Sequence, residues 1–257
     1  MGKIISIANQ KGGVGKTTTT INLAASIAEK GYQVLVVDMD PQGNATSGLG
    51  IEKNELDKTL YELLRDECTI EECMTKSAVD NLVVIPSNRQ LAGIELEFIG
   101  QENMQYVLKE KLESIKNKFD VIMIDCPPAL GTLTINAMTA TQTVIVPIQC
   151  EFYALDGLSQ LIYTLELVKE SLNPELEIDG ILFTMYDGRT NLAVQVVENV
   201  REHLDQPIYK TVIPRNVRLA EAPSHGLPIT LYAPKSIGAE RYRELAEEVM
   251  KKRKGRK

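Results

Sequence analysis

The stretch Asn9-Gln10-Lys11-Gly12-Gly13-Val14-Gly15-Lys16-Thr17-Thr18 decides the fold of this 257-residue chain. A mostly apolar run, Lys3–Ala8, precedes it, and a segment of helical period, Thr17–Lys30, follows it. A glycine-rich turn between a buried strand and the start of a helix directs backbone N–H groups and the positive end of the helix dipole at one point. The order of these segments predicts a binding loop for the phosphates of a nucleotide.

Individual side chains of this loop have separate expected roles. The Lys16 ammonium should reach the β- and γ-phosphates, and the Thr17 hydroxyl should ligate Mg²⁺. A dinucleotide-binding fingerprint would need a third glycine where the chain has Thr18, so a Rossmann oxidoreductase is disfavoured. The loop residues predicted to bind the nucleotide are Lys11, Gly12, Gly13, Val14, Gly15, Lys16, Thr17 and Thr18.

Short apolar runs alternate with segments of helical period along the rest of the chain. The predicted strands are Lys3–Ala8, Val34–Asp38, Leu82–Pro86, Val121–Asp125, Thr143–Ile148, Ile178–Met185 and Ile208–Ile213. The predicted helices are Thr17–Lys30, Met104–Lys116, Leu133–Ala140, Leu155–Leu172, Asn191–Leu204 and Ala239–Lys252. This alternation predicts an α/β fold of the P-loop NTPase type, with a mostly parallel twisted sheet and helices on both faces. We expect one domain over residues 1–250 and a basic tail over residues 251–257.

Composition and charge restrict the class of protein. With 44% hydrophobic and 25% charged residues, and no apolar run long enough for a signal peptide or a membrane span, the sequence predicts a cytoplasmic globular protein. The net charge is −7, and the tail contributes six positive charges, so the first 250 residues carry −13. Binding to a polyanion must therefore use local basic clusters. The cysteines lack the spacing of a zinc or disulfide framework; they are Cys68, Cys73, Cys126 and Cys150.

The phosphate loop departs from the usual P-loop pattern at one position. The pattern would place a glycine at position 10, where the chain has Gln10, and the chain carries an additional lysine, Lys11. This resembles the deviant Walker A motif of the ParA/MinD ATPase superfamily. Further motifs, in fixed order, look like those of the chromosome-partitioning ParA proteins of the Soj type: DMDPQGN at 38–44, IDCPP at 124–128, IPRNVRL at 213–219 and EAPSHG at 221–226. The resemblance extends from about residue 3 to 250.

Three aspartates follow predicted strands, at the edge where open α/β sheets bind ligands. Asp125 ends its strand, where an acid can orient the water ligands of Mg²⁺ without binding the ion itself. Asp38 is a further candidate beside the metal. Asp40 lies two residues past its strand, where it can accept a hydrogen bond from the attacking water, and the resemblance implies that role. Each aspartate could instead cap a loop.

Lys11 lies five residues before Lys16, on the outer rim of the loop, where it can add little to its own phosphate site. The resemblance implies that ATP drives formation of a homodimer in which two subunits enclose two ATP molecules and each Lys11 enters the facing site. It makes Lys11, Lys16 and Asp40 the expected catalytic residues, with slow hydrolysis in the absence of a partner protein.

The resemblance also implies ATP as the nucleotide, with its adenine against Pro214 and Asn216. A guanine-reading string, NKFD, does occur at Asn117–Asp120, but it precedes the strand Val121–Asp125. It should therefore lie at the amino end of the sheet, away from the nucleotide.

Basic residues in the last third of the chain are candidates for DNA contact because neutralising phosphates gives affinity that does not depend on sequence. Scattered surface cations are the alternative. The resemblance links Arg189 and Arg218 to non-specific binding of double-stranded DNA by the ATP dimer. The tail KKRKGRK could be a solvated end or an additional polyanion contact.

The leading functional prediction is an ATP-dependent, nucleoid-associated partitioning ATPase whose hydrolysis is stimulated by a ParB-like centromere-binding protein. The first alternative is a MinD-like, membrane-cycling regulator of cell division, which would need an apolar C-terminal helix on the bilayer. Here the stripe of Tyr242, Leu245, Val249 and Met250 should pack on the sheet instead, so no stable membrane association is expected. The second alternative, an iron–sulfur ATPase of the nitrogenase type, would need two suitably placed cysteines, whereas Cys150 stands alone.

Overall fold

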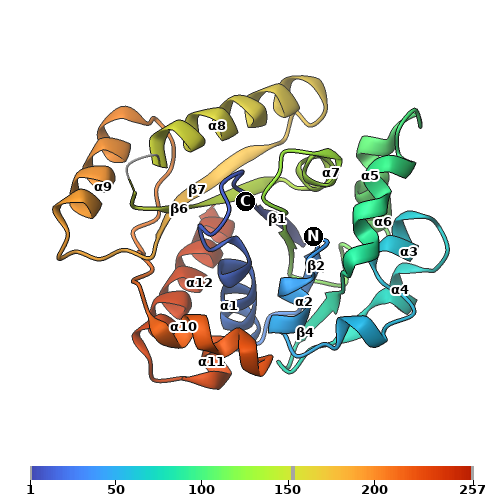
Figure 1. Ribbon diagram of the computed structural model, residues 1–257, viewed down its shortest axis with the longest axis horizontal. Helices are drawn as coiled ribbons and strands as arrows, with labels where there is room; N and C mark the ends of the chain where they lie inside the picture. The colour runs from blue at the N-terminus through green and yellow to red at the C-terminus, as the bar shows by residue number, and fades with distance from the viewer. Residues whose placement is uncertain (1, 152–153, 256–257) are drawn as a thin grey trace.

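The computed structural model describes residues 2–151 and 154–255 and shows a twisted sheet with helices on both faces (Figure 1). In space the strands follow the order β3-β4-β2-β5-β1-β6-β7, and every pair is parallel except β3–β4. The strands are β1 (Lys3–Ile7), β2 (Val34–Asp38), β3 (Thr75–Lys76), β4 (Leu82–Ile85), β5 (Val121–Asp125), β6 (Thr143–Gln149) and β7 (Glu177–Thr184). The predicted fold class is thus confirmed.

The six predicted helices are present within a few residues of their expected ends. The longer helices are α1 (Lys16–Ala28), α6 (Val107–Glu113), α7 (Thr132–Ala140), α8 (Ala154–Ser171), α9 (Asn191–His203) and α12 (Ile237–Gly255). Short helices that the sequence analysis missed are α2 (Asn44–Gly48), α3 (Leu60–Leu64), α4 (Ile70–Cys73), α5 (Ile94–Glu97), α10 (Val217–Glu221) and α11 (Ile229–Tyr232). Two of them had a readable signal, because Thr59 and Glu62 form a capping box at α3, as Thr69 and Glu72 do at α4.

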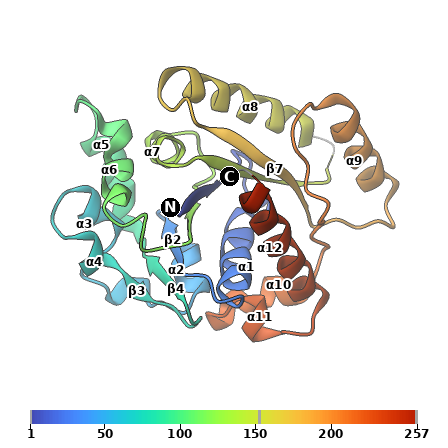
Figure 2. The same cartoon turned by 180° about the vertical axis from the view of Figure 1, so that it is seen from behind.

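Two apolar cores hold the layers together, one on each face of the sheet. The first joins the sheet to α3, α6, α7, α8 and α9, and the second joins it to α1, α2 and α12. Figures 1 and 2 show α7 and α8 on one side of the sheet and α1 beside α12 on the other. Because both faces are covered, β2 and β5 are buried along their whole length, as parallel strands must be.

The apolar stripe of α12 lies inside the second core. Tyr242, Leu245, Val249 and Met250 are all buried there, against the layer that contains α1. Within the described residues, no helix combines the length and apolar character needed to cross a bilayer.

The prediction of a regular strand over Ile208–Ile213 was wrong. This segment runs beside β7, and the N–H groups of Tyr209 and Ile213 donate to β7 carbonyl oxygens. It forms no continuous strand, only isolated bridges at Ile208 and, just beyond the segment, at Pro214. The reason lies in α12: the Glu248 carboxylate accepts hydrogen bonds from the backbone N–H groups of Lys210 (2.9 Å) and Thr211 (3.1 Å). The Thr211 N–H lies between those of Tyr209 and Ile213, which both reach β7, so its capture by Glu248 interrupts the ladder.

A buried polar cluster attaches the same segment to the sheet. A register shift between β6 and β7 gives β7 an extra residue, Asp179. Its carboxylate accepts a hydrogen bond from Lys3 Nζ of β1 (2.5 Å) and another from the hydroxyl of buried Tyr209. The neighbouring Gly180 leaves room for the Tyr209 ring, since a Cβ atom built there would lie 2.7 Å from ring atom Cε2.

Replacing Gly180 with alanine should lower the free energy of unfolding by about 1–3 kcal/mol, because the added methyl group overlaps the Tyr209 ring. Urea unfolding monitored by circular dichroism measures the loss. Gly93→Ala is a suitable control, because its added Cβ atom meets no neighbour closer than 3.7 Å. Equal stability of the two variants would contradict the proposed overlap.

Candidate nucleotide site

The loop between β1 and α1 has the backbone that an anion site requires. Gly13 (φ 75°) and Gly15 (φ 89°) adopt left-handed conformations that favour glycine. Helix α1 begins at Lys16 with no side-chain cap and no acidic residue in its first turn. The N–H groups at its positive end are therefore available to a phosphate.

Lys16 lies within this loop and is 7% exposed. Its ammonium donates a hydrogen bond to the Lys11 carbonyl oxygen (3.1 Å). Burial lowers the pKa of Lys16, and the negative charge of Asp125 opposes that shift. An anion bound here would provide the strong partner that a buried ammonium lacks.

Two buried carboxylates lie side by side under the loop. Asp38 and Asp125 are register partners at the carboxyl ends of β2 and β5, and both are fully buried. The Thr46 hydroxyl donates to Asp38 Oδ2 (2.7 Å), and the Thr20 hydroxyl donates to Asp125 Oδ1 (2.8 Å). The other oxygen of Asp125, Oδ2, has no hydrogen-bond partner among the described residues.

Burial raises the pKa of Asp125, and the charge of Asp38 raises it further; the hydroxyls of Thr20 and Thr17 oppose the shift. Burial also raises the pKa of Asp38. Such a pair is costly without a counter-charge. Carboxylate and hydroxyl oxygens beside a phosphate loop fit Mg²⁺, a hard cation that takes oxygen ligands. No three His, Cys, Asp or Glu side chains in the described part of the chain form a metal site by themselves, so phosphate and water would supply the remaining ligands.

Asp40 lies in the turn that follows β2 and is 8% exposed. Its Oδ1 atom accepts a hydrogen bond from the backbone N–H of Gln42 (2.9 Å). Its backbone carbonyl oxygen accepts from the Ser87 hydroxyl (2.8 Å) and from the Gly43 N–H (2.8 Å). Fixed turn geometry thus places this carboxylate near the Asp38–Asp125 pair.

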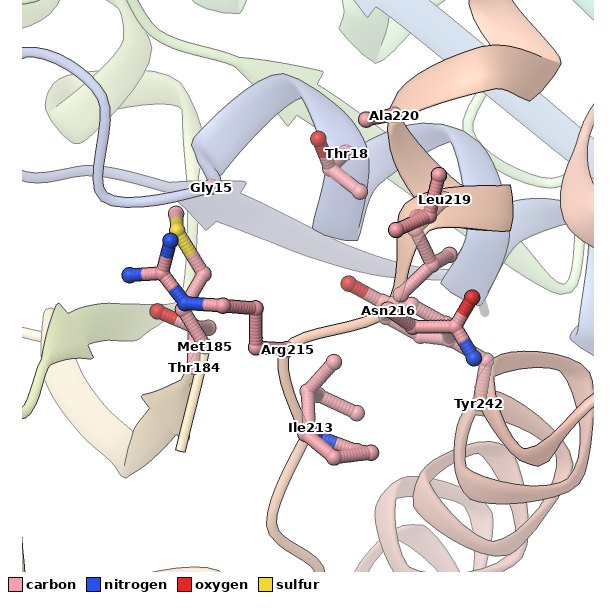
Figure 3. A pocket seen from close by; sticks show the side chains of 12 residues that line it. Gly15, Thr18, Thr184, Met185, Ile213, Arg215, Asn216, Leu219, Ala220 and Tyr242 are labelled. Carbon is pink, nitrogen blue, oxygen red and sulfur yellow. The ribbon is translucent and has the colours of Figure 1, made fainter. Parts of the chain in front are cut away.

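A cavity of about 330 Å³ opens beside the first turn of α1. Figure 3 shows Asn216, Tyr242 and Ile213 on one side and Gly15, Thr184 and Met185 on another. Pro214, Asn216, Gly15 and Thr18, all predicted site residues, line it. The Asn216 side chain accepts a hydrogen bond from the Arg218 N–H (2.8 Å) and so caps α10.

Tyr242, Thr184 and Met185 also line the cavity, and the sequence analysis did not place them there. Tyr242 comes from α12, and its hydroxyl is hydrogen bonded to that of Thr19 in α1 (3.3 Å). Thr184 ends β7 and donates to the Val14 carbonyl oxygen (2.8 Å). No local motif marks these positions, since they reach the cavity only through the sheet order and the packing of α12.

Lys11 occupies the rim of the loop, with its ammonium 3.0 Å from a carboxylate oxygen of Glu151. Its backbone N–H donates to the Asn9 side chain (2.9 Å), which itself donates to the Pro147 carbonyl oxygen (2.8 Å). The loop is thereby held on β6, and the Lys11 side chain is paired within its own subunit.

The chain matches known proteins along its whole length. Residues 2–178 match the model of the AAA domain family. The chain is 56% identical to sporulation initiation inhibitor protein Soj of Bacillus subtilis, covering 97% of this chain and 98% of that protein. It is 50% identical to the chromosome partitioning protein ParA of Myxococcus xanthus, covering 98% and 89%. The chain belongs to this AAA domain family and, within the ParA/MinD superfamily, to its Soj-type ParA group.

Solved structures agree with this ParA membership. The chain is similar to cobyrinic acid a,c-diamide synthase from Mycobacterium smegmatis with bound ADP and magnesium (TM-score 0.89, 35% identity, covering 100% of this chain and 97% of that one). It is also similar to the cell division ATPase MinD of Pyrococcus furiosus (TM-score 0.81, 30% identity, covering 98% and 99%). The family predicted from the motifs is therefore confirmed.

The two arginines predicted to contact DNA in this ParA chain lie on neighbouring segments outside the cavity. Arg189 follows β7, and its side chain is 89% exposed and paired with Asp187 (2.6 Å). The pair lowers the pKa of Asp187 to about 2. Arg218 in α10 is 60% exposed and paired with Glu221 (2.8 Å). A bridge between Tyr186 and Pro214 brings the two segments together.

The buried carboxylates lead to a prediction for the ligand-free ParA chain. Because the folded state raises the pKa of Asp125 from 3.8 to about 8, the contribution of Asp125 to the free energy of unfolding should decrease as the pH rises between these two values. Asp125→Asn should flatten this slope and raise the free energy of unfolding by roughly 1 kcal/mol at pH 8. Urea unfolding at pH 5.5 and pH 8 tests this, with the exposed Asp57→Asn as control. A steeper slope in Asp125→Asn would refute it.

Proposed function

We propose that this chain is a partitioning ATPase that binds ATP with Mg²⁺, closes into a homodimer and binds double-stranded DNA in that state. A ParB-like partner then stimulates hydrolysis, and DNA is released. One observation carries the proposal: the uncapped start of α1 opens onto a cavity of about 330 Å³ and carries buried Lys16, close to an Asp125 oxygen that has no hydrogen-bond partner among the described residues. The names of the Soj and ParA relatives support the partitioning role.

In this proposal the loop residues and the cavity bind different parts of the ATP molecule. Backbone N–H groups of Gly12, Gly13, Val14 and Gly15 and the Lys16 ammonium hold the phosphates, while the adenine enters the cavity beside Pro214 and Asn216. Bound Mg²⁺ would neutralise charge on the β- and γ-phosphate oxygens. The Thr17 hydroxyl would hold it directly, and Asp125 and Asp38 would do so through water.

Hydrolysis then depends on holding a water molecule in line with the terminal phosphate. Asp40 accepts a hydrogen bond from this water, whose oxygen attacks the γ-phosphorus. The bond to the β–γ bridging oxygen breaks, ADP leaves with the electron pair, and a proton is released to solvent. Lys16 stabilises the negative charge that develops on the phosphates.

In the dimer, Lys11 of each subunit enters the nucleotide site of the other. Its rim position and its solvent-accessible ion pair with Glu151 allow it to exchange Glu151 for the γ-phosphate of a facing subunit. Without that second lysine each site lacks one positive charge, so hydrolysis by the free monomer is slow.

Gly12→Val should leave nucleotide binding intact and prevent the ATP-dependent dimer. A Cβ atom on Gly12 meets nothing within 4 Å in the monomer, and its φ lies outside the left-handed region, so any obstruction must come from a facing subunit. Size-exclusion chromatography with ATP, together with binding of a fluorescent ATP analogue, separates the two effects. Gly12→Ala should give a milder defect, and a normal dimer in Gly12→Val would argue against this closure.

Each subunit has a net charge of −7, so DNA binding depends on local basic contacts, and one subunit offers too few of them. Two subunits facing one duplex present two copies of exposed Arg189 and Arg218. Contacts to phosphates alone would make the affinity independent of sequence and steeply dependent on salt.

Arg189→Glu should abolish ATP-dependent DNA binding without affecting the dimer, because its side chain lies outside the nucleotide cavity. Arg218→Ala should weaken binding to all sequences equally and flatten the dependence of log K on log salt by roughly one unit per lost contact. Filter binding on two unrelated duplexes over a salt series measures both. Lys118→Glu makes the same charge change before β5 and should bind normally. Strong sequence preference would contradict the proposal.

A membrane-cycling function like that of MinD is less well supported. The apolar stripe of α12 is buried on the α1 side of the sheet and is not available to a bilayer; it consists of Tyr242, Leu245, Val249 and Met250. We propose that the protein acts in the cytoplasm, on the nucleoid, because the proposed DNA binding does not depend on sequence.

A further inference from the structure

Four buried residues form a closed ring of hydrogen bonds behind the Asp40 turn. The Asp40 N–H donates to Asp38 Oδ1 (3.2 Å), and the Thr46 hydroxyl donates to Asp38 Oδ2 (2.7 Å). The Ser87 N–H donates to Thr46 Oγ1 (3.0 Å), and the Ser87 hydroxyl donates to the Asp40 carbonyl oxygen (2.8 Å). The ring joins the end of β2, the start of α2 and the segment after β4.

The turn that begins at Asp40 also packs closely against Ser87 at its far end, at Gly43. Gly43 has a φ of 60°, and a Cβ atom on it would lie 2.6 Å from the Ser87 carbonyl oxygen. Asp38, Thr46 and Ser87 are each 0% exposed, so water cannot replace a lost hydrogen bond easily.

The Asp40 carboxylate itself lies outside the ring and keeps spare hydrogen-bonding capacity. Its backbone N–H and carbonyl oxygen are both held by the ring, whereas its side chain accepts one hydrogen bond, from Gln42, within the described part of the chain. The ring therefore fixes the position of the Asp40 backbone, from which the side chain extends. The second carboxylate oxygen of Asp40 remains able to accept a hydrogen bond from a ligand.

We propose that Ser87 is a positioning residue for Asp40: through the Asp40 backbone it sets the direction from which the carboxylate meets the attacking water. This inference rests on the role given to Asp40 in the proposed function. Ser87 contacts neither nucleotide nor water in this scheme. It acts from the segment that follows β4, and β4 pairs with β2, the strand that precedes the Asp40 turn. A displacement of about 1 Å in a group that orients a reactant can cost as much as a hundredfold in rate.

Ser87→Ala removes the hydroxyl while keeping the Thr46 contact of the backbone N–H. We expect kcat for ATP to fall about tenfold while KM and the affinity for a fluorescent ATP analogue stay within about twofold, since the phosphate loop is untouched. The matched control is Ser26→Ala, because Ser26 is equally buried and also donates to a backbone carbonyl oxygen, that of Asn22 (2.7 Å). Ser26→Ala should show a similar fall in melting temperature with normal kcat.

A second pair of variants tests the ring itself. Thr46→Val loses both the donor to Asp38 and the acceptor for Ser87 and should reduce kcat by at least as much as Ser87→Ala. Thr46→Ser keeps the hydroxyl and should restore kcat to within about twofold of the wild type.

Measuring Asp40→Ala in the same assay distinguishes a failure of the proposed catalytic role of Asp40 from a failure of the positioning role of Ser87. Normal hydrolysis by Asp40→Ala would overturn the catalytic role in the proposed function, and this inference with it. If Asp40→Ala binds ATP but is inactive, while Ser87→Ala has the same kcat as Ser26→Ala, only the positioning role is overturned. A rise in KM at unchanged kcat in Ser87→Ala would overturn it as well.

Discussion

The buried pair of Asp38 and Asp125 is the constraint on which the rest of the site depends. Parallel register puts the two carboxylates side by side, and the covered sheet removes them from water. Hydroxyls of Thr46 and Thr20 satisfy one oxygen each, while one Asp125 oxygen has no partner within the described residues. The fold thus stores unfavourable electrostatic energy where a cation would relieve it, and such stored cost is typical of functional sites.

Helix α12 connects the two halves of the cavity. Tyr242 meets Thr19 of α1, and Glu248 holds the backbone of Lys210 and Thr211 just before the segment that carries Pro214. One helix therefore fixes both the element that begins at the phosphate loop and the wall opposite to it.

The parts of the molecule that were readable from sequence are those that local patterns specify. The glycines and Lys16 indicate the phosphate loop, and continuous apolar runs indicate the buried parallel strands. The segment Ile208–Ile213 has strand-like residues, but Glu248 accepts hydrogen bonds from two of its N–H groups, 37 and 38 positions away in sequence. The contact between Ser87 and Thr46 spans 41 positions, and neither residue belongs to a recognisable motif. Such contacts follow from sheet order, which composition and period do not encode.

The short segment from Ile213 to Arg218 belongs to two surfaces at once. Asn216 lines the cavity with its side chain and caps the helix that carries Arg218, while the Arg215 N–H donates to the Tyr186 carbonyl oxygen at the start of the Arg189 loop (3.2 Å). A ligand in the cavity and a ligand on the arginines must therefore share one piece of backbone. Thermodynamic linkage then requires the effect to be reciprocal. If the first ligand changes the affinity for the second by some factor, the second ligand changes the affinity for the first by the same factor.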